Sequence, residues 1–563
     1  MIVLDVETYP DYWLLAMMRL SDQRVIYFEQ YAGHNFDRNA LMAAMSRNTT
    51  ISFNGLSYDL PMIAAALDGW DNAALKRLSD TIVRTNKPAF AICRDSGLTI
   101  PAHWDHVDII SVAPGRSSLK IYGGRIHAPK LQDLPYDPDD LIDANRREQL
   151  RRYCVNDLET TALLHEKLQG PIDLRSRMSS EYGMDLRSKS DAQIAETVIK
   201  SELTAKTGSK YTTPKLPRDY GFTYQDPGIL SFQTPQLQRV FDRLRQTRFA
   251  LNGAGNVEMP DWMRHESISI SGREYRLGIG GLHSTEQRQC VKANNEHLLF
   301  DLDVASYYPN IILQQQLAPT TLGVPFLEVY QSIVERRLEA KRTGDDVTNA
   351  ALKIAINGSF GKFGSKYSAL YSPDLLIQTT ITGQLALLML IERIDAAGAS
   401  VVSANTDGIV VSCPVGVEPD VEQAAWGWML DTTYELERTD YRLIASRDVN
   451  NYLAVKASGG TKGKGAFASA SLQKNPDGNI VYKAVTEYAE HETPVADTIW
   501  ACDDVRDFLT VRAVKGGATW RGELLGKAVR FYKALSVGSH ESIQYAINGF
   551  KVPRSDGCRP VMD

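Results

Sequence analysis

The sequence has little cysteine, and what it has is scattered. The six residues are Cys93, Cys154, Cys290, Cys413, Cys502 and Cys558, and no two of them form a C-x-x-C pair. This spacing argues against a zinc site and against a disulfide framework, and it suits a reducing compartment. We find no apolar stretch approaching the roughly 18 residues that a membrane span needs. The start, MIVLDVETYPDYW, lacks the basic n-region of a signal peptide. These absences together predict a cytoplasmic protein without a membrane partner.

A strong excess of one charge is also missing. The net charge is −6 and the isoelectric point is near 6.0, so the bulk charge carries no nucleic-acid signature. A locally basic groove remains compatible with that balance. Repeats and low-complexity segments are absent as well. The chain has 563 residues with 43% hydrophobic and 23% charged residues, which is too long for one core and predicts two to five globular domains.

The N-terminal part contains the first set of acidic residues that could act together. In IVLDVET, a strand candidate, Asp5 and Glu7 are two apart and share a face, where two like charges are costly unless a cation lies between them. Asp59 ends a polar turn after the next strand candidate, and Tyr153 and Asp157 are four apart on a helical pattern. Taken singly, these residues also fit a solvated edge strand, a helix N-cap and a helix surface.

The order D-x-E, N-x3-Y-D and Y-x3-D resembles the three motifs of the DnaQ-like 3′→5′ proofreading exonucleases. The resemblance implies that Asp5, Glu7, Asp59 and Asp157 hold metal ions. It makes Tyr153 the group that orients the attacking water, and it places Asn54 at the primer end. Two-metal hydrolysis of a phosphodiester needs such a convergence of carboxylates.

Between these motifs lies a segment with a weaker resemblance. Ser118 and Leu119 resemble a Ser/Thr-Leu motif that binds single-stranded DNA, and Lys130 resembles the auxiliary catalytic lysine of the exonuclease in protein-primed polymerases. A Ser-Leu pair and a single lysine are common in any sequence, so this prediction rests mainly on the order of the motifs.

A second set of acidic residues lies in the middle of the chain. Asp303 ends the apolar strand candidate HLLFDLDV, and Asp407 lies in VVSANTDGIVVS, which predicts a β-hairpin. Without further context Asp303 is a strand end and Asp407 a turn residue. Asp303, Ser306, Tyr308 and Pro309 match D-x-x-S-L-Y-P, motif A of the family B DNA polymerases.

The same resemblance assigns roles to both segments. Asp303 and Asp407 become the catalytic metal ligands, and Tyr308 packs under the deoxyribose, where a 2′-hydroxyl would clash. The hairpin resembles motif C, D-T-D-S, with Asn405 at the first Asp and Gly408 at the Ser. The family motif has no acid at Asp301, so its role stays open.

Cationic residues lie on two helical patterns between these motifs. Arg337 and Lys341 are four apart, as are Lys353 and Asn357. The first segment can also be a solvated amphipathic helix, whereas LKIAINGSFGKFG resembles motif B, K-x3-N-S-x-Y-G. The resemblance makes Arg337, Lys341 and Lys353 triphosphate ligands and places Asn357 near the incoming nucleotide. Cations at that position suit the charge of the departing pyrophosphate.

Residues that could hold DNA flank the second set. Gly280 and Gly281 precede motif A and allow a close approach of the backbone to phosphate, or simply a sharp turn. Tyr452 resembles the tyrosine of the K-x-Y region, and Lys462 and Lys464 lie among glycines that follow it. Basic and aromatic residues also interleave near the C-terminus, which fits either duplex contact or an ordinary basic surface.

The implied fold is an α/β and α+β multidomain protein, with a ribonuclease-H-like exonuclease domain and a right-hand polymerase of palm, fingers and thumb. The expected domains are the exonuclease domain (1–190), a connector (191–265), the first part of the palm (266–325), the fingers (326–370), the second part of the palm (371–455) and a thumb or DNA-binding region (456–563).

The resemblance implies a DNA-directed DNA polymerase with proofreading, of a compact bacteriophage type that works in the bacterial host cytoplasm. The expected cofactor is Mg²⁺, or Mn²⁺ in its place, with two ions in each active site. The expected partners are primer–template DNA and dNTPs, and replication accessory proteins are a further class that it allows. Alternatives are a protein-primed polymerase, an exonuclease with an inactive polymerase scaffold, and a non-catalytic replication factor. Only fifty positions separate Asp303 from Lys353, too few for the insertions of the protein-primed branch, so we expect a nucleic-acid primer.

Overall fold

The chain divides into two compact units. The computed structural model describes residues 1–85, 87–217 and 219–561. Unit 1 comprises Met1–Ser190, Ala470–Ile480 and Cys502–Asp563, and unit 2 comprises Asp191–Ser469 and Val481–Ala501. The region 456–563, which the sequence suggested as one thumb-like region, is therefore divided between the two units.

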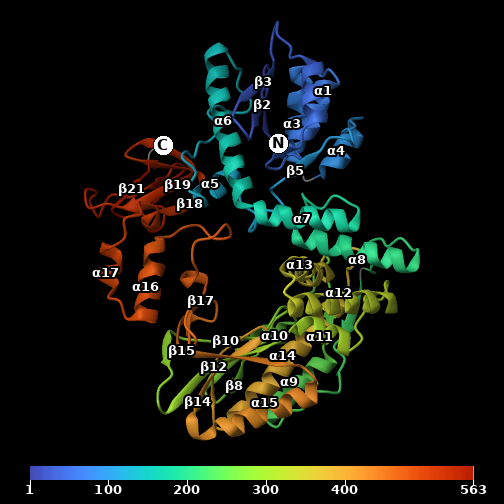
Figure 1. Cartoon of the computed structure of the whole chain (residues 1–563), viewed down its shortest axis with the longest axis vertical. Helices are drawn as coiled ribbons and strands as arrows, with labels where there is room; N and C mark the ends of the chain where they lie inside the picture. Colours follow the sequence, from blue (N-terminus) through green and yellow to red (C-terminus); the bar gives the residue numbers. More distant parts are fainter. Residues whose placement is uncertain (86, 218, 562–563) are drawn as a thin grey trace. The chain divides into compact units, whose positions relative to one another are not determined.

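Unit 1 is built on a five-stranded sheet with the order β3-β2-β1-β4-β5. The strands are β1 (Ile2–Thr8), β2 (Trp13–Arg19), β3 (Val25–Gln30), β4 (Thr50–Ser52) and β5 (His106–Asp108). The pairs β3-β2 and β2-β1 are antiparallel, whereas β4 runs parallel to both β1 and β5. Helices cover both faces (Figure 1).

The alternation of side chains along β1 sends its residues to two different cores. Leu4 and Val6 pack with Trp13 against α1 (Arg38–Arg47), α2 (Asp59–Leu67), α3 (Asn72–Arg84) and α4 (Ala89–Asp95). Val3 packs on the other face with α5 (Leu119–Arg125) and α6 (Ala144–Lys167), and α7 (Gln169–Tyr182) follows α6. Asp5 and Glu7 lie on the face of Val3, toward α6, because strand side chains alternate.

A second sheet in unit 1 comes from the end of the chain. Its order is β20-β18-β19-β21, and the two long strands β18 (Thr510–Trp520) and β19 (Glu523–Lys533) form an antiparallel hairpin. The short strands β20 (Gln544–Tyr545) and β21 (Cys558–Pro560) flank them, and η3 (Val505–Phe508) precedes them. This C-terminal sheet packs on α5.

Unit 2 is built on a ten-stranded sheet, most of it antiparallel hairpins. Its order is β17-β16-β15-β12-β14-β13-β10-β9-β8, and β11 pairs with β15. The central strands are β12 (His297–Val304), β13 (Ser400–Asn405), β14 (Gly408–Pro414) and β15 (Leu436–Asp448). The others are β8 (Ile268–Ile270), β9 (Arg273–Arg276), β10 (His283–Thr285), β11 (Gln289–Lys292), β16 (Asn451–Lys456) and β17 (Thr461–Lys464). A separate pair, β6 (Gly221–Thr223) and β7 (Arg248–Ala250), lies outside this sheet.

Eight longer α-helices, two short ones and two 3₁₀ turns complete the described part of unit 2. They are α8 (Asp191–Thr207), α9 (Pro235–Gln246), α10 (Asp261–His265), α11 (Tyr307–Gln314), α12 (Val324–Thr343), α13 (Asp346–Phe363), α14 (Pro373–Ala396), α15 (Glu418–Thr432), α16 (Asn479–His491) and α17 (Val495–Trp500), with η1 (Val415–Val417) and η2 (Gly465–Phe467) as single 3₁₀ turns.

Helix α14 is the core of unit 2. Of the residues that the structure describes, this helix alone is long and apolar enough by length and composition to cross a membrane, and 83% of its apolar window is buried. The sequence analysis found no such stretch, because Thr379, Thr382 and Gln384 interrupt its apolar residues. These polar side chains are buried as well, and their hydrogen bonds run to neighbouring helical carbonyls, to Tyr224 and to the backbone of Gly278.

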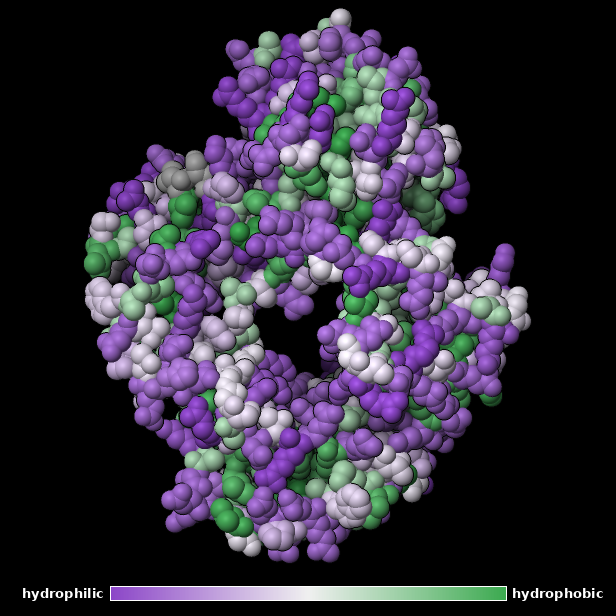
Figure 2. All heavy atoms as spheres, in the orientation of Figure 1, coloured by the Kyte–Doolittle hydropathy of each residue, from purple (hydrophilic) through white to green (hydrophobic). Residues whose placement is uncertain are grey.

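Helices α12 and α13 form an antiparallel pair, and α8 packs against both (Figure 1). Two ion pairs join α8 to them, Glu202 with Arg336 at 2.9 Å and Glu196 with Lys362 at 2.9 Å. The start of the segment that the sequence suggested as a connector thus belongs to this helical layer. On the face drawn in Figure 2, hydrophilic residues predominate and hydrophobic ones form small scattered patches.

The contact between α13 and α8 generates a stability prediction. A Cβ atom added at Gly358 would lie 2.6 Å from the backbone oxygen of Asp191 and 2.8 Å from Cβ of Ala195, whereas one added at Gly361 meets nothing within 4 Å. Gly358→Ala should therefore destabilise unit 2 by about 1–3 kcal/mol through overpacking. Gly361→Ala, on the same helix, should stabilise it by up to about 1 kcal/mol. Calorimetric unfolding of both variants tests this, and equal shifts would contradict the close contact.

Candidate active sites

Four carboxylates of unit 1 lie around the end of β1. Asp5 and Glu7 come from β1, Asp59 from the first turn of α2, and Asp157 from α6. The backbone N–H of Val6 donates to Asp59 at 2.9 Å, which fastens α2 to the strand. Tyr153 lies one turn before Asp157 on α6 and is buried. The structure therefore brings together the four carboxylates and Tyr153, which are five of the residues that the sequence assigned to this site.

Burial and mutual repulsion raise the pKa values of these carboxyl groups. For Asp5 the burial comes first and the charge of Asp157 second, and together they raise its pKa to about 7. The pKa of Glu7 is raised by burial and then by Asp5 and Asp157, and that of Asp59 by burial and then by Asp5. Uncompensated acids in one place are what a bound cation relieves.

The chemistry of the donors fits a hard divalent cation. All four candidate ligands are carboxylates, the oxygen donors that Mg²⁺ and Ca²⁺ take, and no thiolate or imidazole ligand has to be displaced. Within residues 1–85, 87–217 and 219–561, no group of three or more His, Cys, Asp or Glu side chains has the geometry of a finished metal cage. The fit therefore rests on the donor set and its uncompensated charge.

The lysine at this site is Lys120, which the sequence analysis missed. Its Nζ donates to the Tyr153 hydroxyl at 2.7 Å and lies 3.3 Å from Oδ2 of Asp157. Lys130, the lysine expected here, is exposed, and the described residues include no hydrogen bond or ion pair to it. The available signal was the position of Lys120 directly after Ser118 and Leu119, which puts it on α5 facing α6.

Asp108 and Cys154 are two further residues of the site without a sequence signal of their own. Asp108 is buried at the end of β5 and accepts from the backbone N–H groups of Asn54 at 2.8 Å and Leu56 at 3.1 Å. These bonds hold Asn54 in the left-handed region, with φ of 74°. The thiol of Cys154 donates to Oδ2 of Asp5 at 3.1 Å.

Ser118 and Leu119 have structural roles in the described contacts. The Ser118 hydroxyl caps α5 by accepting from the backbone N–H of Ile121 at 3.4 Å, and Leu119 packs against the core next to α6. Their proposed contact with single-stranded DNA stays a prediction, as does that of Asn54.

The second acidic cluster lies in unit 2, where β12 meets the β13–β14 hairpin. Asp303 on β12 is the register partner of Gly408, and Asp407 occupies the hairpin turn. A Cβ atom at residue 408 would lie 2.1 Å from Oδ1 of Asp303, so glycine there leaves room for that carboxylate. Burial, and then repulsion by Asp303, raises the pKa of Asp407.

Asn405, which stands where motif C has its first aspartate, has a structural role in this turn. Its amide nitrogen donates to the carbonyl oxygen of Val449 at 3.3 Å, and its amide oxygen accepts from the hydroxyl of Thr406 at 3.0 Å. An aspartate lacks the N–H that the Val449 carbonyl receives. The side chain thus ties the hairpin turn to the end of β15.

Asp301, whose role the sequence left open, holds a lysine beside Asp303. The buried Asp301 carboxylate accepts from the Tyr441 hydroxyl at 3.0 Å and lies 3.3 Å from Nζ of Lys462. The same Nζ is 3.7 Å from Asp303. Asp301, Asp303, Asp407, Lys462, Lys464 and Tyr452 line one cavity of about 430 Å³.

A second cavity, of about 330 Å³, shares Thr406 and Asp407 with the first in its lining. Tyr308 lines it and stacks on Phe360, with ring centres 4.5 Å apart, and its hydroxyl donates to the carbonyl of Gly280 at 3.1 Å. Asn357 and Arg337 come from α13 and α12 and line the same cavity. The buried Nε of Arg337 has no hydrogen-bond partner among the described residues, so a donor is available there for an anion.

Two expected phosphate ligands do not reach this cavity. Lys341 is exposed and lies 3.7 Å from Glu437, and Lys353 is exposed on α13; neither is among the residues that line the cavity. Spacing by four residues places cations along one helix face, but the facing layer decides which of them points inward.

Gly281 and Tyr452 are fixed against the second cluster. A Cβ atom at Gly281 would lie 2.7 Å from the Thr406 hydroxyl, so the loop before β10 runs directly against the hairpin turn, whereas one at Gly280 meets nothing within 4 Å. Tyr452 lies opposite Lys464 in the β16–β17 pair and is half-buried.

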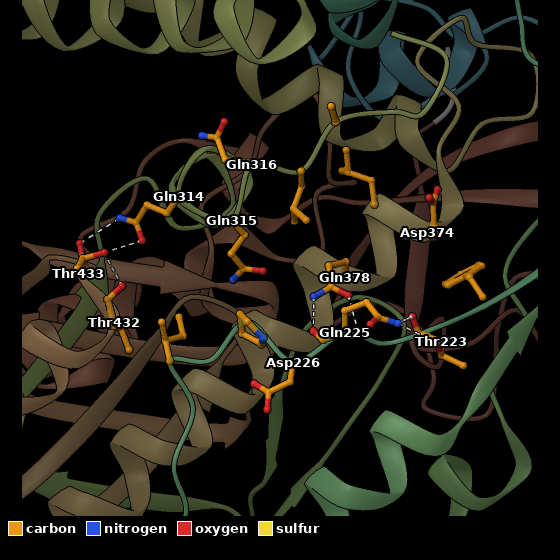
Figure 3. A pocket seen from close by; sticks show the side chains of 16 residues that line it. Thr223, Gln225, Asp226, Gln314, Gln315, Gln316, Asp374, Gln378, Thr432 and Thr433 are labelled. Atoms are coloured by element: carbon orange, nitrogen blue, oxygen red, sulfur yellow. Dashed lines mark hydrogen bonds between the residues drawn. The ribbon is translucent and has the colours of Figure 1, made fainter. Parts of the chain in front are cut away.

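A further cavity of unit 2, about 570 Å³, does not share this chemistry. Figure 3 shows it lined by amide and hydroxyl side chains, among them Gln225, Gln315 and Thr433, with the carboxylates Asp226 and Asp374. Several of these groups bind one another, as Gln378 binds the backbone of Gln225. Among the described residues that line it there is no lysine or arginine.

No protein-family model matches the chain. An alignment over 209 residues is 26% identical to DNA polymerase 1 of Aeropyrum pernix, and it covers 30% of this chain and 21% of the archaeal protein. The fold aligns with the structure of the family B DNA polymerase from the hyperthermophilic archaeon Pyrobaculum calidifontis at a TM-score of 0.42 and 13% identity, over 99% of this chain and 74% of that one. The chain thus spans about a fifth of the length of the curated relative it matches.

The raised pKa of Asp5 generates a prediction about pH. Its carboxyl group titrates near pH 4 in the unfolded chain and at about 7 in the folded one, so the folded state holds the extra proton. The stability from this proton is complete below about pH 4 and is lost as the pH rises to about 7. The asparagine of Asp5→Asn cannot titrate. In EDTA, the unfolding temperature of this variant should therefore rise relative to that of the wild type as the pH increases from about 4 to about 7.

Asp22→Asn is the matched control, because Asp22 is an exposed acid in the β2–β3 turn of the same sheet. Calorimetry of both variants from pH 4 to 8 provides the measurement. Parallel curves for the two variants would contradict the assignment of repulsion to the Asp5 site.

Proposed function

We propose that the chain is a DNA-directed DNA polymerase of the family B type with a 3′→5′ proofreading exonuclease, encoded by a bacteriophage or a related mobile element. The observation that carries the proposal is the pair of separate acidic clusters, each with the side chains that its reaction needs. One has four carboxylates with Tyr153 and Lys120. The other has Asp303 and Asp407, and Asp407 lines two cavities. The sequence match to an archaeal DNA polymerase supports the same assignment.

The second cluster suits nucleotidyl transfer because its cavities differ in kind. We assign the incoming dNTP to the cavity of Tyr308, Phe360, Asn357 and Arg337. The Tyr308 ring then lies against the sugar, and Arg337 donates to a phosphate oxygen. The primer end is assigned to the other cavity, where Lys462 and Lys464 face the backbone of the strand. Asp407 lines both cavities, so it lies where the two substrates would meet.

Asp303 and Asp407 would hold Mg²⁺ ions here, and Asp5, Glu7, Asp59 and Asp157 would hold them in unit 1. Bound metal supplies Lewis-acid stabilisation of the attacking and leaving oxygens in both reactions. Tyr153, whose hydroxyl accepts from Lys120, would orient the attacking water for hydrolysis. The five-stranded mixed sheet with helices on both faces supports a ribonuclease-H-like assignment for this part.

Nucleic-acid priming in the bacterial cytoplasm belongs to the same proposal. The short span between Asp303 and Lys353 favours it over a protein primer. An exonuclease with an inactive polymerase scaffold was suggested by Asn405, but that side chain is engaged in the turn while Asp303 and Asp407 remain in place. Extension of a DNA primer with dNTPs and Mg²⁺, with no added protein, tests this assignment against both alternatives.

The two clusters should be separable by substitution. Asp407→Asn should lower primer extension by about 10²–10³-fold, because a carboxylate that meets the transition-state charge is removed. It should leave degradation of single-stranded DNA unchanged. Asp5→Ala combined with Glu7→Ala should do the reverse. Both rates are measured on one labelled primer–template, and a parallel loss of both activities in either variant would refute two independent sites.

Tyr308→Val should relax the choice of sugar. The ring that would meet a 2′-hydroxyl is then gone, so the preference for dNTPs over rNTPs should fall by about tenfold or more. Tyr434→Phe is the control, because it removes a hydroxyl from a buried tyrosine that does not line the cavity. Single-nucleotide insertion kinetics give the ratio, and an unchanged preference in Tyr308→Val would exclude the assigned role.

A further inference from the structure

Helix α5 lies between the carboxylate site and the C-terminal sheet. Its two adjacent glycines make opposite contacts. A Cβ atom at Gly123 would lie 3.0 Å from Cγ2 of Thr160 on α6, and one at Gly124 would lie 2.7 Å from Cγ1 of Val511 on β18. Ile121 on the same helix joins Val511 and Ala528 in a small buried cluster. The helix is therefore packed closely on both sides.

Hydrogen bonds fasten the segment that follows α5 to the same sheet. Arg530 on β19 is buried, and its guanidinium donates to the carbonyl oxygens of Ala128 and Pro129, some 400 positions earlier in the chain. The backbone N–H of Lys527 donates to Asp133 at 2.8 Å. Because Arg530 is buried and donates hydrogen bonds to two carbonyl oxygens, it acts as a structural tie and not as a DNA contact.

The end of α5 is held by a third part of unit 1. The Arg125 side chain donates from Nε to Asn475 at 2.7 Å and from Nη1 to the carbonyl oxygen of Leu472 at 2.6 Å. The segment 470–480 thus fixes the last turn of the helix, while β18 fixes its middle.

This short helix carries Lys120, the cation of the carboxylate site. Its Nζ reaches Tyr153 and Asp157 on α6, and it also lies 4.5 Å from the centre of the Tyr153 ring. Lys120 belongs to α5. A shift of α5 against the C-terminal sheet therefore moves the ammonium group relative to Tyr153 and Asp157.

We propose that the C-terminal sheet is a positioning element of the carboxylate site in unit 1. By packing Val511 against Gly124 and binding the carbonyls after α5 through Arg530, it sets the distance of Lys120 from Tyr153 and Asp157. This inference rests on the proposed exonuclease function. It predicts that changes at the end of the chain act on strand degradation and not on strand synthesis.

A size swap at one contact tests this proposal in the full-length chain. Gly124→Ala places a methyl group against Val511, whose β-branched side chain has little freedom to move away. Degradation of a 5′-labelled single-stranded oligonucleotide should slow by about tenfold or more under single-turnover conditions, because a small misplacement at a reacting centre has large effects. Oligonucleotide affinity and primer extension should be unchanged. Adding Val511→Ala, which removes the clashing methyl groups, should restore the rate to within about threefold of the wild type.

Two further variants separate positioning from mere packing. Gly170→Ala, on α7 with nothing within 4 Å, is the matched glycine control and should degrade DNA at the wild-type rate. Combining Gly124→Ala with Lys120→Ala should cost no more than Lys120→Ala alone, because the shift acts through that lysine. If the contact had only a structural role, the rate losses of Gly124→Ala and Lys120→Ala would multiply in the double variant.

Arg530→Lys covers the case in which Gly124→Ala fails to fold. It adds no atom to the interface and keeps the charge, but it loses the fork that reaches both carbonyls. The same selective loss of degradation is expected. A wild-type degradation rate in Gly124→Ala or Arg530→Lys, or a size-swap double variant as slow as the single one, would overturn the proposal. A wild-type chain that degrades no DNA would refute the proposed exonuclease instead.

Discussion

Repulsion between carboxylates held in one place is the constraint on which both candidate sites depend. In each unit the fold places acids on one face of a strand and adds others from a neighbouring element, so that charge accumulates where solvent is limited. Each unit also supplies one lysine, Lys120 or Lys462, which lies between two of the groups. One ammonium group offsets part of the charge and leaves the rest for a cation. The two sites are built on unrelated sheets but meet the same electrostatic requirement.

Local periodicity predicted which side chains share a face, and the resemblance to known motifs joined the acids into two sites. The alternation along β1 placed Asp5 and Glu7 on one face, and the helical spacing placed Tyr153 and Asp157 on one face of α6, which packs on that strand in the structure. The hairpin around Asp407 followed from its Asp-Gly turn. In each case a repeat of two or about four residues determines the direction of a side chain.

The sequence could not reveal which cations complete the sites. Lys120 lies 33 positions before Tyr153 and has no periodic relation to it. From the sequence, Lys130 was therefore as good a candidate for the lysine of this site. On α12 and α13, Arg337, Lys341 and Lys353 had the same local signal, but only Arg337 lines the cavity, because packing against other elements selects one direction. The basic and aromatic residues near the C-terminus gave the same ambiguity, and Arg530 forms hydrogen bonds within unit 1. Charge type is local information, whereas the partner is set by tertiary structure.

Helix α14 has a consequence for how the chain reaches this state. Helix α14 is buried on nearly every side, so it has no polar face that could contact water before the elements around it have folded. Some of the elements that cover it, such as β8 and α11, are synthesised before it, whereas the strands β13 and β14 come after it. During synthesis its apolar surface is therefore bare until the later strands emerge. A low growth temperature should favour soluble protein, because it weakens the hydrophobic association of that surface while long-range pairing is still incomplete.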